Sequence, residues 1–144
     1  MINKEETIKQ YREKQEKYIY YLIALDVSSI AFSIYTTKDS SLNIIQIPLA
    51  IAVFFWGLSI FYGLRFIRVS LSSLFTEYLY METKEDNRFT ALNTEYKKNL
   101  IDAFRNRNDK DNKLGIRFEK IMSYSFYIGI LLYITFHILE MYNR

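Results

Sequence analysis

Three long apolar blocks, at residues 19–35, 44–64 and 121–139, dominate this sequence of 144 residues. Asp26 is the only charged residue within them, and the other charges gather between the blocks. A bilayer core about 30 Å thick needs about 20 helical residues, because each residue advances a helix by about 1.5 Å. The sequence therefore predicts an all-α membrane protein with three transmembrane helices, at residues 19–36, 44–64 and 121–141.

The distribution of Lys and Arg predicts how these spans are oriented. Five basic residues precede the first block, one lies between the first two blocks, twelve lie at residues 65–120, and Arg144 ends the sequence. Positive side chains are retained on the cytoplasmic side of a membrane. We therefore expect residues 1–18 and 65–120 in the cytoplasm, and the turn at 37–43 and the C-terminus outside. The first 18 residues mix five basic with four acidic side chains, unlike a cleaved signal peptide, so the first span should be retained.

Helical periodicity continues beyond the spans. Residues 1–18 are predicted to extend the first span as a cytoplasmic helix. Pro48 falls in the first turn of the second span, where a missing N–H costs little. After that span an apolar stripe recurs at helical spacing, which predicts one long amphipathic helix to about Met81. Its members are Leu71, Leu74, Phe75 and Tyr78.

A second cytoplasmic helix is expected to follow. Thr83 and Asp86 have the spacing of a capping box, and acidic residues at the start with Arg105 and Arg107 at the end would suit the helix dipole. Its apolar stripe comprises Phe89, Leu92, Tyr96, Leu100 and Phe104. The polar run NRNDKDNKLG at 106–115 is predicted to be a loop before the third span.

The strongest candidate for a functional site is a polar stripe in the first span. Asp26, Ser29, Ser33 and Thr36 follow one another at steps of three, four and three, so they share one helix face. An ionisable group at mid-membrane costs at least about 2.5 kcal/mol on insertion scales. We expect a symmetric homo-oligomer, taken as a tetramer, in which these residues line a pore that favours cations.

Two other interpretations of this stripe stay open. The hydroxyls and a protonated Asp26 can hydrogen-bond across the helix bundle, with Gln46 as a partner, and so hold the helices together. Alternatively, Asp26 can transfer protons.

Several residues of the other two spans are assigned to packing. Ser59 with Gly63 and Ser125 with Gly129 are small-residue pairs that allow close helix contact. Trp56 and Gly57 are also interpreted as packing residues. His137 and Glu140 lie one turn apart and lack a third ligand nearby, so they are interpreted as an interfacial hydrogen-bonding pair and not as a metal site.

Six basic residues precede the third span and form a candidate binding surface. We expect them to bind anionic lipid headgroups, with an anionic signal such as a nucleotide or short oligonucleotide as the alternative. These residues are Arg105, Arg107, Lys110, Lys113, Arg117 and Lys120.

The chemistry of an enzyme is not visible in the sequence. It has one His, no Cys and four Gly, and it carries no phosphate-binding loop, nucleophile elbow or H-E-x-x-H motif. We therefore expect no catalytic residues, no cofactor and no bound metal.

A polar N-terminal helix that enters a two-span hairpin, followed by a long amphipathic continuation of the second span, resembles the SLATT family of bacterial defence effectors. The similar region covers about residues 4–81, from KEETIKQYREKQEKY to RFIRVSLSSLFTEYLYM. The third span is an addition to the two-span pattern. The resemblance implies a pore that depolarises the infected cell in abortive infection and is gated by the nucleotide signal of a partner enzyme.

Two functions of other classes compete with the pore. A non-conducting adaptor would recruit a soluble partner through its cytoplasmic helices. A small ion- or proton-coupled transporter is disfavoured, because three spans rarely enclose a path and no inverted repeat is visible.

Overall fold

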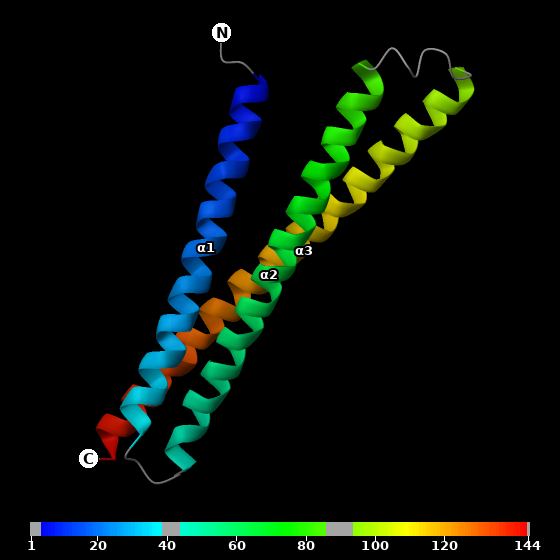
Figure 1. Ribbon diagram of the computed structural model, residues 1–144. Helices are drawn as coiled ribbons and strands as arrows, with labels where there is room; N and C mark the ends of the chain where they lie inside the picture. Colours follow the sequence, from blue (N-terminus) through cyan, green and yellow to red (C-terminus); the bar gives the residue numbers. More distant parts are fainter. Residues whose placement is uncertain (1–3, 39–43, 86–93, 144) are drawn as a thin grey trace. The chain divides into compact units, whose positions relative to one another are not determined.

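The computed structural model describes residues 4–38, 44–85 and 94–143. They form α1 (Lys4–Thr37), the short 3₁₀ helix η1 (Ile44–Gln46), α2 (Ile47–Glu85) and α3 (Thr94–Tyr142), coloured from blue to red along the chain in Figure 1. Three segments are long and apolar enough to cross a membrane, namely Lys9–Thr37, Ile44–Thr83 and Glu95–Tyr142. The prediction of an all-helical, multi-pass membrane protein is confirmed.

The first two long helices extend well beyond the apolar blocks. α1 combines the polar residues from Lys4 onward with the first apolar block in one helix of 34 residues. α2 continues past Leu64 to Glu85, which agrees with the predicted long helix. Pro48 is the second residue of α2, so its missing N–H removes no hydrogen bond from the helix interior.

The predicted loop at 106–115 is wrong, because these residues belong to α3. Their polar side chains bind α2 instead of forming a turn. The hydroxyl of Ser72 donates to Asp111 at 3.1 Å, and Ser73 donates to Asn108. Gly115, one turn after Asp111, is buried, and a Cβ built on it would stand 3.6 Å from the ring of Phe66. A polar helix face was thus mistaken for a loop, and Arg107 does not end a helix.

The predicted helix start at Thr83 is also wrong. Thr83 lies near the end of α2, where its hydroxyl donates to the Leu79 carbonyl at 2.8 Å. Asp86, Phe89 and Leu92 of the predicted cap and stripe lie outside the described residues, as does most of the turn predicted at 37–43.

The chain packs as two compact units. The first comprises Met1–Leu64 with Glu119–Arg144, and the second comprises Arg65–Phe118. In the first unit, α1, α2 and α3 each contribute buried side chains, and the side chain of Gln15 donates to Glu119 at 2.6 Å. Its apolar core consists of Ile19, Leu22, Leu49, Ala52, Trp56, Met122, Phe126 and Phe136.

The second unit pairs α2 with α3 through a polar face. The buried side chains of α2 in this unit include the polar Ser73, Thr76 and Thr83, in addition to the apolar Phe66. Exposed side chains on α2 include the apolar Leu71 and Tyr78, both 62% exposed. The polarity of α2 in this unit is therefore the reverse of that of a helix whose free face meets water.

Candidate functional site

Asp26 lies on the buried face of α1 in the first unit. Ile19, Leu22, Asp26 and Ser33 are spaced so that they fall on one side of the helix, and each is at most 4% exposed. The same helical period that buries the apolar residues therefore buries the carboxylate. No solvent reaches Asp26, which is 0% exposed.

The buried carboxylate faces α2 without a hydrogen bond of normal geometry. Ser59 of α2 is fully buried, and its side chain interacts with Asp26. By distance and angle, however, the two carboxylate oxygens of Asp26 have no hydrogen-bond partner among the described residues, and the Ser59 hydroxyl has none either. A hydrogen bond weakens steeply as its angle departs from linearity, so this contact does not satisfy either group. The predicted bond from Asp26 to Gln46 is not formed.

Trp56 extends this cluster along α2. It precedes Ser59 by three residues, is 2% exposed, and its indole N–H likewise has no acceptor among the described residues. We call Asp26, Trp56 and Ser59 the polar cluster. It offers two acceptor oxygens, one hydroxyl and one N–H donor inside the membrane-spanning unit. Buried polar groups normally have a hydrogen-bond partner. A cluster without one is therefore a candidate site for binding water, an ion or a proton.

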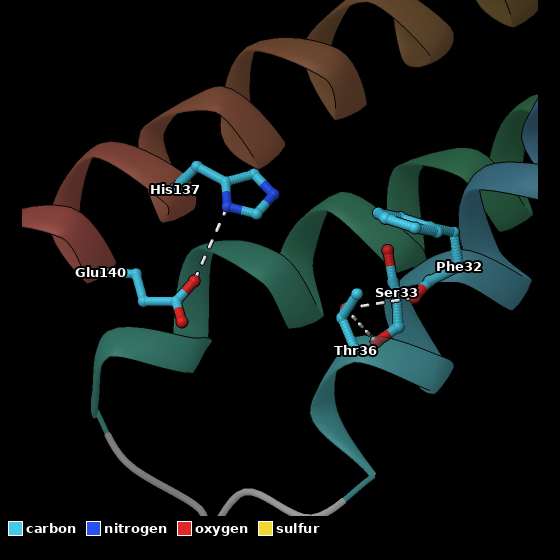
Figure 2. Close-up of polar contacts among 5 residues, drawn as sticks. All are labelled: Phe32, Ser33, Thr36, His137 and Glu140. Atoms are coloured by element: carbon cyan, nitrogen blue, oxygen red, sulfur yellow. Dashed lines mark hydrogen bonds and ion pairs between the residues drawn. The ribbon is translucent and has the colours of Figure 1, made fainter.

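The four residues predicted to line a pore do not share one open surface in the single chain. Asp26 and Ser33 are buried, Ser29 is half-buried and Thr36 is exposed. Figure 2 shows Ser33 and Thr36 near the end of α1, where the Thr36 hydroxyl donates to the carbonyls of Phe32 and Ser33, each at 3.1 Å. The Ser33 hydroxyl donates to the Ser29 carbonyl at 2.8 Å. Both donors are thus used within α1, which leaves the oxygen lone pairs of the hydroxyls for other groups.

Both predicted small-residue pairs lie at close helix contacts, as expected. Ser59, Gly63, Ser125 and Gly129 are all buried. A Cβ built on Gly63 would stand 3.0 Å from Ile23 of α1 and from Met122 of α3. The packing role of Trp56 is confirmed as well, since its ring lies against Gly129 and Tyr133. Gly57, in contrast, is exposed, and no group of the described residues lies within 4 Å of a Cβ built on it, so the predicted packing role is not seen in the described part of the chain.

His137 and Glu140 approach each other on α3, as Figure 2 shows. Their Nδ1 and Oε2 atoms are 3.6 Å apart, which is too long for the predicted hydrogen bond and corresponds to an ion pair only when His137 is protonated. The imidazole also packs edge-on against Tyr133, with the ring centroids 4.5 Å apart. In the described part of the chain, no group of three or more His, Cys, Asp or Glu side chains is placed to hold a metal.

The six basic residues of the predicted binding surface are all exposed on α3. Within the second unit, Lys110, Lys113 and Arg117 are spaced at three and four residues and share one helix face. Lys120 follows three residues later, in the segment assigned to the first unit. Arg105 instead lines a shallow cavity of about 280 Å³ in the second unit. The cavity lies between α2 and α3 and is lined by Thr76, Glu77, Tyr80, Phe104, Arg105, Asn108 and Asp109.

Sequence reasoning missed Ser59 as the neighbour of Asp26 and missed the polar face of α2 in the second unit. Ser59 was recognised only as a small residue. The recurrence of Ser73, Thr76, Tyr80 and Thr83 at steps of three and four was the available signal for the polar face. No protein-family model, curated protein or solved structure matches this chain.

Proposed function

We propose that the protein is a subunit of a homo-oligomeric membrane pore that conducts cations. The observation that carries this proposal is Asp26, which is fully buried in the first candidate span and has no hydrogen bond to either carboxylate oxygen among the described residues. Ion pairing does not explain it, because no basic side chain of the described residues contacts it.

The energetic argument concerns the cost of such a group. Burying a charged or polar side chain without partners destabilises a protein. Removing a carboxylate from water costs on the order of several kcal/mol unless a counter-ion or hydrogen bonds compensate. Ionisable residues in transmembrane helices are rare and commonly mark ion or proton paths. Without a hydrogen-bond partner Asp26 is costly for folding, and an apolar side chain of similar size would avoid that cost. A role in ion passage accounts for its presence.

The hydroxyls of α1 support a preference for cations over anions. Ser33 and Thr36 donate their protons to carbonyls of their own helix, so their oxygens can only accept or coordinate. The Ser33 oxygen lies on the same buried face of α1 as the Asp26 carboxylate, and such oxygens resemble the ligands that replace the hydration shell of a cation in a pore. In the described arrangement α2 covers Asp26, so we propose that this arrangement is closed and that conduction requires α1 and α2 to separate at Ser59.

The resemblance to the SLATT family extends the proposal to a biological setting. In that setting the pore lies in the bacterial inner membrane, with its N-terminus in the cytoplasm. It opens in response to a nucleotide or oligonucleotide signal made by a partner enzyme and depolarises the infected cell. The exposed basic face of α3, at Lys110, Lys113 and Arg117, is then placed to bind anionic lipid, or alternatively that signal.

Planar-bilayer recording of the purified protein tests the proposed pore. We expect single-channel currents with a reversal potential that shifts towards the K⁺ equilibrium value in a KCl gradient. Asp26→Asn keeps the shape of the side chain and should reduce conductance or cation preference while the oligomer persists. Ser28→Ala is the matched control on α1, because Ser28 is exposed and its hydroxyl only donates to the Ala24 carbonyl.

An assembled protein that never conducts, with or without the anionic signals, would instead support the adaptor. The cavity of the second unit favours that second candidate, because it places Tyr80 and Phe104 beside the charged groups of Glu77, Arg105 and Asp109. A soluble protein that co-purifies with the wild type and is lost from Tyr80→Ala would identify this function.

A further inference from the structure

The second unit, Arg65–Phe118, exposes an apolar face of α2 while burying a polar one. Ser73, Thr76 and Thr83 are at most 6% exposed, and Ser73 and its neighbour Ser72 donate hydrogen bonds to α3. On the other side of the helix, large apolar side chains are 42% to 63% exposed. These are Leu71, Leu74, Phe75, Tyr78 and Met81.

Lipid does not account for this exposed face. α2 has 39 residues and is about 58 Å long at about 1.5 Å per residue, whereas the hydrocarbon core is about 30 Å thick. In the same unit, α3 exposes many charged side chains, which excludes the unit from hydrocarbon. They include Lys98, Asp102, Arg105, Arg107, Asp109, Lys110, Lys113 and Arg117.

The spacing of the exposed residues is that of a surface on which another helix packs. Ile67, Leu71, Leu74, Tyr78 and Met81 follow one another at steps of four, three, four and three, which is the a/d pattern of a coiled coil. We call these five residues the α2 seam. Arg68 and Glu82 are exposed beside it and give it a polar rim. A repeat of 3.5 residues is the pattern by which helices pack along one another in a left-handed supercoil.

The seven-residue spacing of Leu71 and Tyr78 continues towards the N-terminus of α2, within the first unit. The positions in register with Leu71 and Tyr78 are Ala50, Gly57 and Leu64, and all three are exposed. Gly57 has open space around a built Cβ. Small residues at an exposed helix face allow the close approach of a neighbouring helix within a membrane.

We infer that the α2 seam packs against the α2 seam of a second copy of this chain. Copies inserted in one membrane share the same direction and depth, so the same residue stands at the same height in each copy. Identical seams therefore meet in parallel and in register, as a symmetric assembly requires. The inference supplies the interface of the oligomer in the proposed function, and it holds whether or not that oligomer conducts.

Cysteine cross-linking tests this interface directly, because the chain has no Cys of its own. Single variants Leu71→Cys, Leu74→Cys and Tyr78→Cys are oxidised in native membranes, together with Ala103→Cys and Asn112→Cys as exposed controls on α3 of the same unit. A disulfide requires Cα atoms within about 7 Å, so we expect roughly tenfold more cross-linked dimer from the seam variants than from the controls.

A second measurement uses the oligomer in mild detergent. Leu71→Glu combined with Tyr78→Glu should convert the oligomer to monomer, because parallel seams would bring like charges together, while Ala103→Glu should leave it assembled. Seam variants that cross-link no better than the controls would overturn the inference, and so would thiols that resist a soluble maleimide yet never join to one another. Seam cross-links in a protein without current would reject the pore and keep the interface, whereas current without seam cross-links would do the reverse.

Discussion

The indole nitrogen of Trp56 lies against the backbone of Gly129, at 2.5 Å from the position that a Cβ on Gly129 would occupy. Real Cβ atoms do not approach another heavy atom so closely, so only glycine fits here. The contact joins α2 to α3 inside the first unit and fixes the ring one turn away from Ser59. The position of Trp56 in the polar cluster therefore depends on a glycine of a different helix.

Gly129→Ala tests this contact. The added methyl group meets a rigid ring and not a flexible chain end, so Trp56 or the helix backbone must move. We expect a loss of about 1–3 kcal/mol of stability, which is typical of overpacking in a close-packed core. The thermal unfolding midpoint in detergent should fall for Gly129→Ala and stay unchanged for Ser28→Ala, because Ser28 is exposed and its hydroxyl donates only to the Ala24 carbonyl of its own helix. Equal midpoints for both variants would contradict the geometry.

Asp26→Leu distinguishes the effect of the carboxylate on folding stability from its proposed role in cation conduction. Because neither oxygen has a hydrogen bond among the described residues, an apolar side chain should be tolerated or should stabilise the first unit by about 1–3 kcal/mol. We expect a higher unfolding midpoint and no cation current. If Asp26 instead holds the helices together as a protonated hydrogen-bond donor, Asp26→Leu should lower the midpoint and disrupt the oligomer.

The basic face of α3 should bind anionic lipid. Replacing Lys110, Lys113 and Arg117 by Gln should reduce the amount of phosphatidylglycerol retained by the detergent-purified protein, measured by native mass spectrometry. A single exposed Lys or Arg near an anionic surface contributes about 1 kcal/mol, so the triple variant should lose most of this binding. Lys97→Gln, on the opposite side of the helix, is the control. Unchanged lipid but lost oligonucleotide binding would identify this face as the site of a signal.

The orientation of the chain in the membrane is predicted from its Lys and Arg distribution and is testable with reporter fusions. A phosphatase fused after Asn143 should be active, because we expect the C-terminus outside. The same enzyme inserted after Asn112 should be inactive, since residues 65–120 are expected in the cytoplasm. Activity in the reverse pattern would require either the opposite insertion or a different number of spans.

The sequence alone was sufficient for the three spans and the continuation of α2 past Leu64. Both follow from averages over many residues, because a block of about 20 apolar residues is stable in lipid whatever surrounds it. The local composition of polar segments, in contrast, did not predict their secondary structure. The run at 106–115 has the composition of a loop, yet Asn108 and Asp111 accept hydrogen bonds from Ser73 and Ser72, and this pairing stabilises the helix.

Tertiary structure decided which face of each helix lies inside. In α2 both the Leu71–Tyr78 stripe and the Ser73–Thr76 stripe have helical spacing, so periodicity reveals two faces but not what each one meets. The rule that apolar faces turn inward holds for a helix in water, whereas lipid and neighbouring copies accept apolar faces as readily as a core does. For the same reason periodicity places Asp26 and Thr36 on one stripe of α1. Only the packing of α1 against α2 at Ser59 determines that Asp26 is buried while Thr36 stays exposed.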